Sequence, residues 1–365
     1  MKEQSGYFGP DSIDRLQSIL EQEKAKKVFL VTGKNSYELS GAKRKVDGLS
    51  QEITTFNDFT SNPKKQDILK GYEEFKKQKY DIFAAIGGGS VIDTAKAIKL
   101  FHYNDTKENT PLVAIPTTSG SGSESTHFIV YYEKGKKQSK GLPEITLPEY
   151  YILDPLLTKS LPSKIAASTG MDALSQAMES YWSINSTPKS KTFAEKSIRT
   201  LLGNLEESIK NPLTSDRERV MIAANLAGKA INITRTTACH SISYPMTSLF
   251  GIPHGHAAAL TLGEMLIFNS QVSEYTCADK RGMGYVKRSI EEINKMFEAE
   301  DSYFVREHIL RLMNNIGLET KLSELGLAEN DLKKIADNGF TPERVRNNPR
   351  ILSKEDLELI LKKIY

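Results

Sequence analysis

The chain has 365 residues, 39% hydrophobic and 26% charged, which is the composition of an ordinary soluble protein with more than one domain. Its 49 basic and 46 acidic side chains nearly cancel, which argues against a nucleic-acid or membrane surface as the main partner. Two cysteines, no apolar leader at residues 1–10 and no apolar run long enough to span a bilayer lead us to expect a cytoplasmic protein.

Short apolar runs alternate with helical patterns in the first half of the chain. The apolar runs predict buried strands at residues 27–32, 53–56, 82–86 and 112–115. The intervening patterns predict helices at residues 66–79 and 91–101. This alternation is typical of a Rossmann-like α/β domain with a parallel sheet. The lysine-rich run at residues 134–137 is interpreted as a solvated loop.

Strand patterns nearly vanish in the second half. Apolar residues recur there at three- and four-residue spacing, and this recurrence predicts helices at residues 166–182, 191–208, 216–232, 286–297 and 353–365. We place the domain boundary at Leu161-Pro162. The pattern therefore predicts an α/β domain over residues 1–161 and an all-helical domain over residues 162–365.

A glycine-rich turn joins the third predicted strand to the following helix. Gly87-Gly88-Gly89-Ser90 lets backbone N–H groups approach an anion, and the helix directs its positive end to the same place. We therefore favour binding of a diphosphate over a plain tight turn. A second polar run follows the fourth strand and includes Thr117, Thr118 and Ser121; it suits a bound nucleotide, although alone it could be a solvated loop.

Two polar side chains share one face of an otherwise apolar predicted helix. Asp172 and Gln176 stand four residues apart, and polar groups among core residues need partners. Farther on, His240 and His254 flank a turn that contains glycine and proline, and His256 follows. A carboxylate and two imidazoles make a reasonable divalent-metal site, while satisfied hydrogen-bonding histidines are the competing interpretation.

These motifs resemble the iron-containing alcohol dehydrogenase family. Gly87-Gly88-Gly89-Ser90 with Asp93 and Lys96 is similar to its GGGSxxDxxK segment, and residues 117–124 are similar to its TTxGTGSE segment. Leu153-Asp154-Pro155, residues 170–174 and Pro253-His254-Gly255 continue the match in order, so that the resemblance covers roughly residues 7–270.

The resemblance implies a dehydroquinate synthase-like architecture, with a dinucleotide-binding α/β domain over residues 1–161 and an all-helical metal and substrate domain over residues 162–365. It implies hydride transfer between a nicotinamide and an alcohol or aldehyde. It also implies a divalent metal, Fe(II) or Zn(II), that polarises the substrate oxygen, and a homodimer. Carried over by position, the metal ligands are Asp172, Gln176, His240 and His254. The second is normally histidine; the glutamine ligates through its amide oxygen, or a water replaces it, or no metal binds.

Five residues are assigned to catalysis by the same resemblance: Asp93, Lys96, Arg235, Tyr244 and His256. Tyr244 stands where most members have histidine, and its hydroxyl could hydrogen-bond the substrate or relay a proton, or the ring could simply pack. Arg235, five residues before His240, would pair with an anionic substrate or form a structural ion pair.

Cofactor and substrate preferences follow from two further segments. Gly33, Lys34, Asn35 and Ser36 replace the acidic residue that binds the ribose in NAD-preferring members, which predicts NADP rather than NAD, unless this is a surface turn that does not discriminate. Residues 234–256 are similar to the phosphonoacetaldehyde reductase branch, which implies reduction of phosphonoacetaldehyde to 2-hydroxyethylphosphonate.

Three other functions remain open from the sequence. A dehydrogenase for an uncharged short-chain alcohol would not prefer an anionic aldehyde over a neutral one of the same size. A dehydroquinate synthase-like lyase would consume no net NADPH. A non-catalytic nucleotide-binding protein would bind the cofactor without turnover, with the changes at Gln176 and Tyr244 marking an inactive site.

Overall fold

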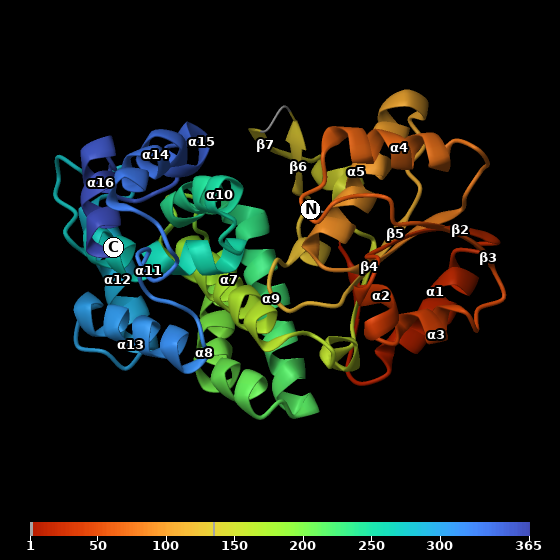
Figure 1. Ribbon diagram of the computed structural model, residues 1–365, viewed down its shortest axis with the longest axis horizontal. Helices are drawn as coiled ribbons and strands as arrows, with labels where there is room; N and C mark the ends of the chain where they lie inside the picture. The colour runs from red at the N-terminus through yellow and green to blue at the C-terminus, as the bar shows by residue number, and fades with distance from the viewer. Residues whose placement is uncertain (1–2, 134–135) are drawn as a thin grey trace. The chain divides into compact units, whose positions relative to one another are not determined.

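The computed structural model describes residues 3–133 and 136–365, and its elements are labelled in Figure 1. The chain divides into two compact units, Met1–Leu161 and Pro162–Tyr365. Among the described residues, no helix combines the length and the apolarity needed to cross a membrane. Within the lysine-rich run, residues 134 and 135 lie outside the described part, and Lys136–Lys140 forms strand β7 instead of the predicted loop.

The first unit is built on a six-stranded sheet in which every neighbouring pair is parallel. The strand order is β1-β8-β5-β4-β2-β3. The strands are β1 (Ser5–Phe8), β2 (Lys27–Thr32), β3 (Glu52–Phe56), β4 (Ile82–Gly87), β5 (Leu112–Pro116) and β8 (Tyr150–Leu153). Strands β6 (Ile129–Glu133) and β7 form a separate antiparallel pair. The four predicted strands and the parallel α/β class are confirmed.

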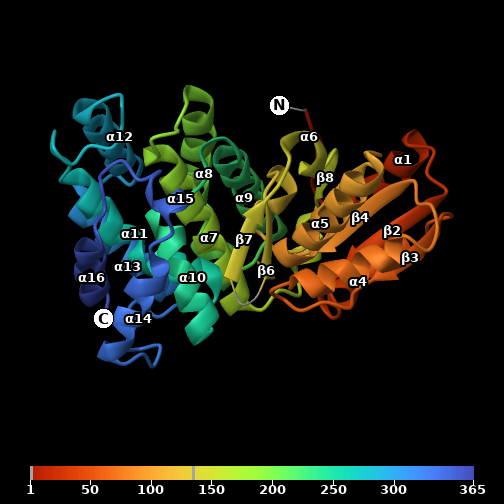
Figure 2. The ribbon, with the colours of Figure 1, turned by 90° about the horizontal axis from the view of Figure 1, so that it is seen from above.

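Alternate side chains of the central strands enter two different cores. Val28 and Leu30 of β2 pack into one, together with residues of the first three helices, whereas Phe29 and Val31 pack into the other, together with α4 and α5. Such strands are buried on both faces and therefore read as continuous apolar runs. Figure 2 shows strands β2 and β3 between α1 on one side of the sheet and α4 on the other. The helices are α1 (Arg15–Gln22), α2 (Ser36–Leu39), α3 (Ala42–Val46), α4 (Lys65–Phe75), α5 (Gly89–Thr106) and α6 (Pro143–Thr146).

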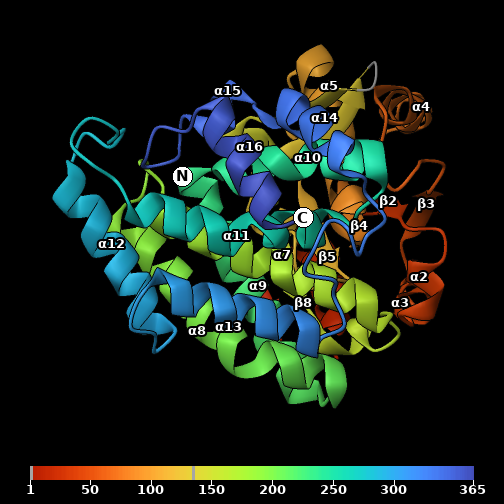
Figure 3. The same cartoon turned by 60° about the vertical axis from the view of Figure 1, so that its left-hand side comes forward.

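The named elements of the second unit are all helices among its described residues, and they surround one large apolar core. All five predicted helices are present, and α10, α11, α13, α14 and α15 are additional (Figure 3). The helices are α7 (Ser163–Trp182), α8 (Pro188–Lys210), α9 (Thr214–Thr234), α10 (Ala238–Phe250), α11 (His254–Ser270), α12 (Met283–Met296), α13 (Ser302–Asn315), α14 (Glu329–Gly339), α15 (Pro342–Val345) and α16 (Lys354–Lys363).

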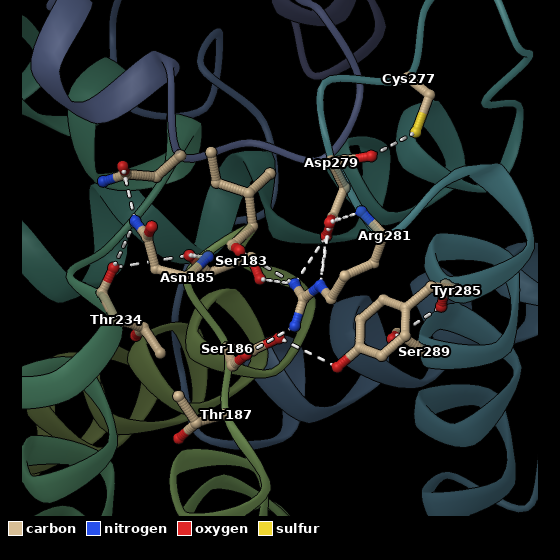
Figure 4. A network of polar contacts seen from close by, with 12 residues as sticks. Ser183, Asn185, Ser186, Thr187, Thr234, Cys277, Asp279, Arg281, Tyr285 and Ser289 are labelled. Atoms are coloured by element: carbon tan, nitrogen blue, oxygen red, sulfur yellow. Dashed lines mark hydrogen bonds and ion pairs between the residues drawn. The ribbon is translucent and has the colours of Figure 1, made fainter.

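A polar network fixes the turn that follows α7 (Figure 4). The guanidinium of Arg281 pairs with Asp279 and donates to the carbonyls of Ser183 and Ser186. In the same turn, Asn185 donates to the carbonyl of Thr234, the last residue of α9. The network thus joins the carboxyl end of α7, which carries Asp172 and Gln176, to the carboxyl end of α9, which precedes the segment with His240.

Candidate active site

Three polar segments begin at neighbouring strand ends in the first unit. The register pairs Thr32 with Ile86 and Gly87 with Pro116, so the segments that follow β2, β4 and β5 begin level with one another. The chain passes from β2 outward to β3 and then returns to the other side of β2 with β4. In α/β sheets, ligands bind outside the carboxyl ends of the strands at such a reversal.

Close packing explains the glycines of the turn after β4. A Cβ on Gly87 would lie 2.5 Å from Val91 Cγ2, and one on Gly89 would lie 2.7 Å from Ser121 Oγ. The glycine turn therefore touches the second polar segment, as the adjacent strand ends require. Helix α5 begins at Gly89 with Gly88 as its N-cap, so no cap side chain competes for the first-turn N–H groups. Such a helix start suits an anion.

The segment after β2 also lies beside this turn. A Cβ on Gly33 would collide with Ser36 Oγ and would lie 3.7 Å from Val91 Cγ2 in the first turn of α5. Lys34 lines an adjacent groove of about 450 Å³. Lys43, which lines the same groove, pairs with Asp47 at 2.8 Å, whereas Lys34 has no ion pair with any described residue.

Asp93 and Lys96 hold the second polar segment from beneath. Asp93 accepts from Ser123 Oγ at 2.5 Å and from the N–H of Val130 at 2.9 Å. Lys96 Nζ donates to Ser123 Oγ at 2.8 Å and to the carbonyl of Phe128 at 3.1 Å, and its side chain is fully buried. Burial lowers the pKa of Lys96 to about 8 despite the nearby carboxylates of Asp93 and Glu124. These contacts fix the backbone between residues 123 and 130.

The second unit brings three of the four predicted metal ligands together. Asp172 comes from α7, His240 from the first turn of α10, and His254 is the first residue of α11. Their ligand atoms all lie within 4.8 Å of one another. Gly251, at φ +71°, ends α10, and Pro253 precedes α11. This short turn returns the chain so that the two imidazole rings stand 5.4 Å apart.

The close approach of α11 to α7 depends on Gly255. A Cβ at this position would collide with the carbonyl oxygen of Ser168 and would lie 2.6 Å from Asp172 Cβ. The glycine that follows His254 therefore lets the start of one helix rest against the backbone of the other. This contact brings His254 to the level of Asp172.

Gln176 lies one turn after Asp172 and is 4% exposed. Burial alone would raise the pKa of the Asp172 carboxyl, but the hydrogen bond from His240, the charges of His254 and His240 and the hydrogen bond from Gln176 outweigh it and lower that pKa. A buried carboxylate and two imidazoles at this spacing fit Fe(II) or Zn(II), with the glutamine beside them.

Glu179, which was not among the residues predicted for the site, is wholly buried beside this cluster. Its Oε2 hydrogen-bonds to His240 Nδ1, while His240 Nε2 lies 3.2 Å from Asp172 Oδ1. Burial would lower the pKa of His240, but the two flanking carboxylates raise it to about 10. A signal was present, because Glu179 continues the polar face of α7 at the helical spacing from Asp172 and Gln176.

Tyr244 lies one turn after His240, and its ring stacks on His254 at 5.8 Å, beside the ligand cluster. His256 is not brought to the cluster. Its ring is buried, and Nε2 donates to the carbonyl of Glu319 at 2.6 Å. Arg235 directly follows α9 with an exposed side chain and a φ of +61°, which is uncommon outside glycine.

Known protein families match residues in each of the two units. Residues 4–155 match the family described as iron-containing alcohol dehydrogenase, and residues 166–365 match the C-terminal region of the same family. A phosphonoacetaldehyde reductase from Streptomyces viridochromogenes is 31% identical over 77% of this chain and 75% of its own. A 1,3-propanediol dehydrogenase from Citrobacter freundii is 29% identical over 98% of this chain and 96% of its own.

Solved structures are also similar to this chain over its whole length. The sulfoacetaldehyde reductase from Bifidobacterium kashiwanohense in complex with NAD+ superposes with a TM-score of 0.86 at 28% identity, covering 100% of this chain and 97% of that one. A 1,3-propanediol oxidoreductase gives a TM-score of 0.85 at 26% identity, with 100% of both chains covered. The chain therefore belongs to the iron-containing alcohol dehydrogenase family, which comprises NAD-dependent alcohol dehydrogenases and aldehyde reductases.

Proposed function

We propose that this protein uses NADPH to reduce a small anionic aldehyde to the alcohol, with phosphonoacetaldehyde as the substrate and 2-hydroxyethylphosphonate as the product. The observation that carries the proposal is the cluster of the buried Asp172 and His240 with the partly buried His254, whose ligand atoms lie within 4.8 Å of one another. In the reaction, the nicotinamide gives a hydride to the carbonyl carbon and a proton is added to the carbonyl oxygen.

The cluster has the donors for Fe(II) or Zn(II), and Gln176 would contribute beside it. A divalent metal bound there supplies Lewis-acid stabilisation of the negative charge that develops on the substrate oxygen. Tyr244, stacked on His254, is our candidate for the hydrogen bond or proton relay to that oxygen. We assign Asp93 and Lys96 to holding the cofactor segment, and His256 to holding the chain near Glu319, because each is buried in such contacts.

Preference for NADP over NAD rests on the segment after β2. Gly33 leaves no carboxylate to repel a 2′-phosphate, and Lys34 lines the adjacent groove without an ion pair among the described residues. The diphosphate would bind at the start of α5, on the turn formed by Gly87, Gly88, Gly89 and Ser90. The neighbouring segment would contribute Thr117, Thr118 and Ser121. The ribose would lie near Asn35 and Ser36.

An anionic substrate is supported by Arg235 and by two relatives. The names of the relatives from S. viridochromogenes and B. kashiwanohense each specify a two-carbon aldehyde with an acidic group, phosphonate in one and sulfonate in the other. Arg235 is exposed and precedes the segment that bears His240, and its planar fork matches such an oxyanion.

The test is NADPH oxidation by protein reconstituted with Fe(II) or Zn(II), with phosphonoacetaldehyde and with propanal as a neutral control. Turnover of the phosphonate with little turnover of propanal supports the proposal. Turnover of propanal alone would support a dehydrogenase for uncharged substrates and would refute the proposed preference for an anionic aldehyde. Binding of NADPH without turnover of either aldehyde would refute the proposed reaction. Light scattering of the same sample tests the homodimer that we also propose.

A further inference from the structure

Glu179 is a buried charge that the proposed reaction does not use. Its side chain is 0% exposed, and it lies seven residues after Asp172 on the same face of α7. A carboxylate without water is stable only when charged or hydrogen-bonding groups surround it. The contacts of this carboxylate therefore indicate its role in the structure.

One oxygen of Glu179 holds the start of α10. Oε1 accepts from the N–H of Thr237 at 3.1 Å and from the N–H of Cys239 at 2.8 Å, and also from Thr237 Oγ1 at 2.6 Å. The N-cap residue Thr237 makes no side-chain cap hydrogen bond of its own. A carboxylate from a neighbouring helix thus takes the place of the cap and complements the positive end of α10.

The other oxygen of Glu179 orients the ring of His240. Oε2 pairs with Nδ1, so that this nitrogen carries the proton and Nε2 is the atom turned toward Asp172, at 3.2 Å. One carboxylate therefore sets both the position of the helix that carries His240 and the nitrogen that His240 presents. Partners of this kind fix the tautomer and the orientation of metal-binding histidines.

We infer that Glu179 is the positioning residue for His240 as a metal ligand. This inference rests on the metal site of the proposed function. It requires that divalent-metal affinity depend on the Glu179 carboxylate, even though Glu179 contributes no ligand atom. It does not require any particular aldehyde substrate.

The test compares Glu179→Gln with a matched control, Glu264→Gln. Glu264 is also a buried glutamate of the second unit, but it pairs with Arg306 at 3.0 Å and Lys363 at 3.2 Å, outside the cluster. Metal-free proteins are titrated with Co(II) against a competing chelator, and the visible absorption of bound Co(II) is recorded. We expect Glu179→Gln to weaken binding about 10- to 100-fold and to change the Co(II) spectrum, whereas Glu264→Gln retains both.

A second variant, Glu179→Asp, tests the same inference in case Glu179→Gln does not fold. Glu179→Asp keeps the charge but shortens the side chain, so that it cannot reach both Nδ1 and the amides of α10, and we expect weaker Co(II) binding here too. Wild-type affinity and spectrum in either folded variant overturn the inference, as does a wild-type protein that binds no divalent metal. If the Glu179 variants bind Co(II) more weakly than the wild type, and the wild type reduces no aldehyde, the inference about Glu179 is supported and only the proposed reaction is refuted.

Discussion

Replacing Gly255 by alanine tests whether the start of α11 must rest directly on α7. The new Cβ would lie 2.6 Å from Asp172 Cβ, whereas nonbonded carbons prefer about 3.5–4.0 Å. The two helices must therefore separate by roughly 1 Å, and overpacking of this kind costs about 1–3 kcal/mol in the free energy of unfolding. The same displacement moves His254 away from Asp172, so we expect Co(II) affinity to fall by at least about tenfold.

The single tryptophan makes the assay specific to the second unit. Trp182 is 2% exposed at the end of α7, so its fluorescence during urea unfolding reports on this helix. We expect the Gly255→Ala midpoint to fall by about 1 M urea. Gly203→Ala is the control, because a Cβ on this exposed residue of α8 meets no atom within 4 Å, and its midpoint should rise slightly. Unchanged midpoint and Co(II) affinity in Gly255→Ala would refute the packing argument.

Three further predictions concern the cofactor, pH and the substrate. Gly33→Asp should lower kcat/KM for NADPH relative to NADH, because its carboxylate would repel a 2′-phosphate; steady-state kinetics with both cofactors checks this. Lys96 has a folded-state pKa of about 8 against 10.5 in the unfolded chain, so the unfolded state binds more protons between these values and stability rises with pH. Relative to Lys96→Met, the wild-type free energy of unfolding should increase by up to about 1.4 kcal/mol per pH unit in that window, measured by denaturant unfolding followed by circular dichroism. Arg235→Gln should raise KM for phosphonoacetaldehyde at least about tenfold and leave KM for propanal unchanged; equal effects on both would contradict an anion contact.

The sequence predicts strands β2, β4 and β5 well because these strands are buried on both faces. Runs such as Val28–Val31 are apolar at every position, and a glycine or proline ends or directly follows each of these three strands. Strand β1 was missed because it lies at the edge of the sheet, where Ser5 and Phe8 are exposed and no apolar run forms. Burial on both faces made β2, β4 and β5 recognisable. It does not account for the edge strand β3, which was predicted although most of it is not buried, nor for β8, which is buried throughout and was not predicted.

Helix α11 shows why the second unit was harder to predict. Its residues are buried on all sides from Gly255 to Asn269, so they show no division into an apolar and a polar face. Helix α10 also contains Pro245, which argues against a helix in a sequence pattern. The residue types of the candidate ligands could be read from the sequence. Their meeting point depends on the packing of Gly255, which spacing along the chain does not encode.

Glu179 also bears on whether the cluster can hold a metal with glutamine, and not histidine, at position 176. Asp172 and Glu179 are two buried carboxylates that flank one imidazole, and without a metal they hold that imidazole as a cation. A divalent ion that replaces the proton on His240 would neutralise both carboxylates, which the proton alone does not achieve. Histidine and glutamine are both neutral ligands, so the exchange at Gln176 alters the donor atom but leaves this charge balance intact. We therefore expect the electrostatic driving force for a metal at this site to come from Asp172 and Glu179.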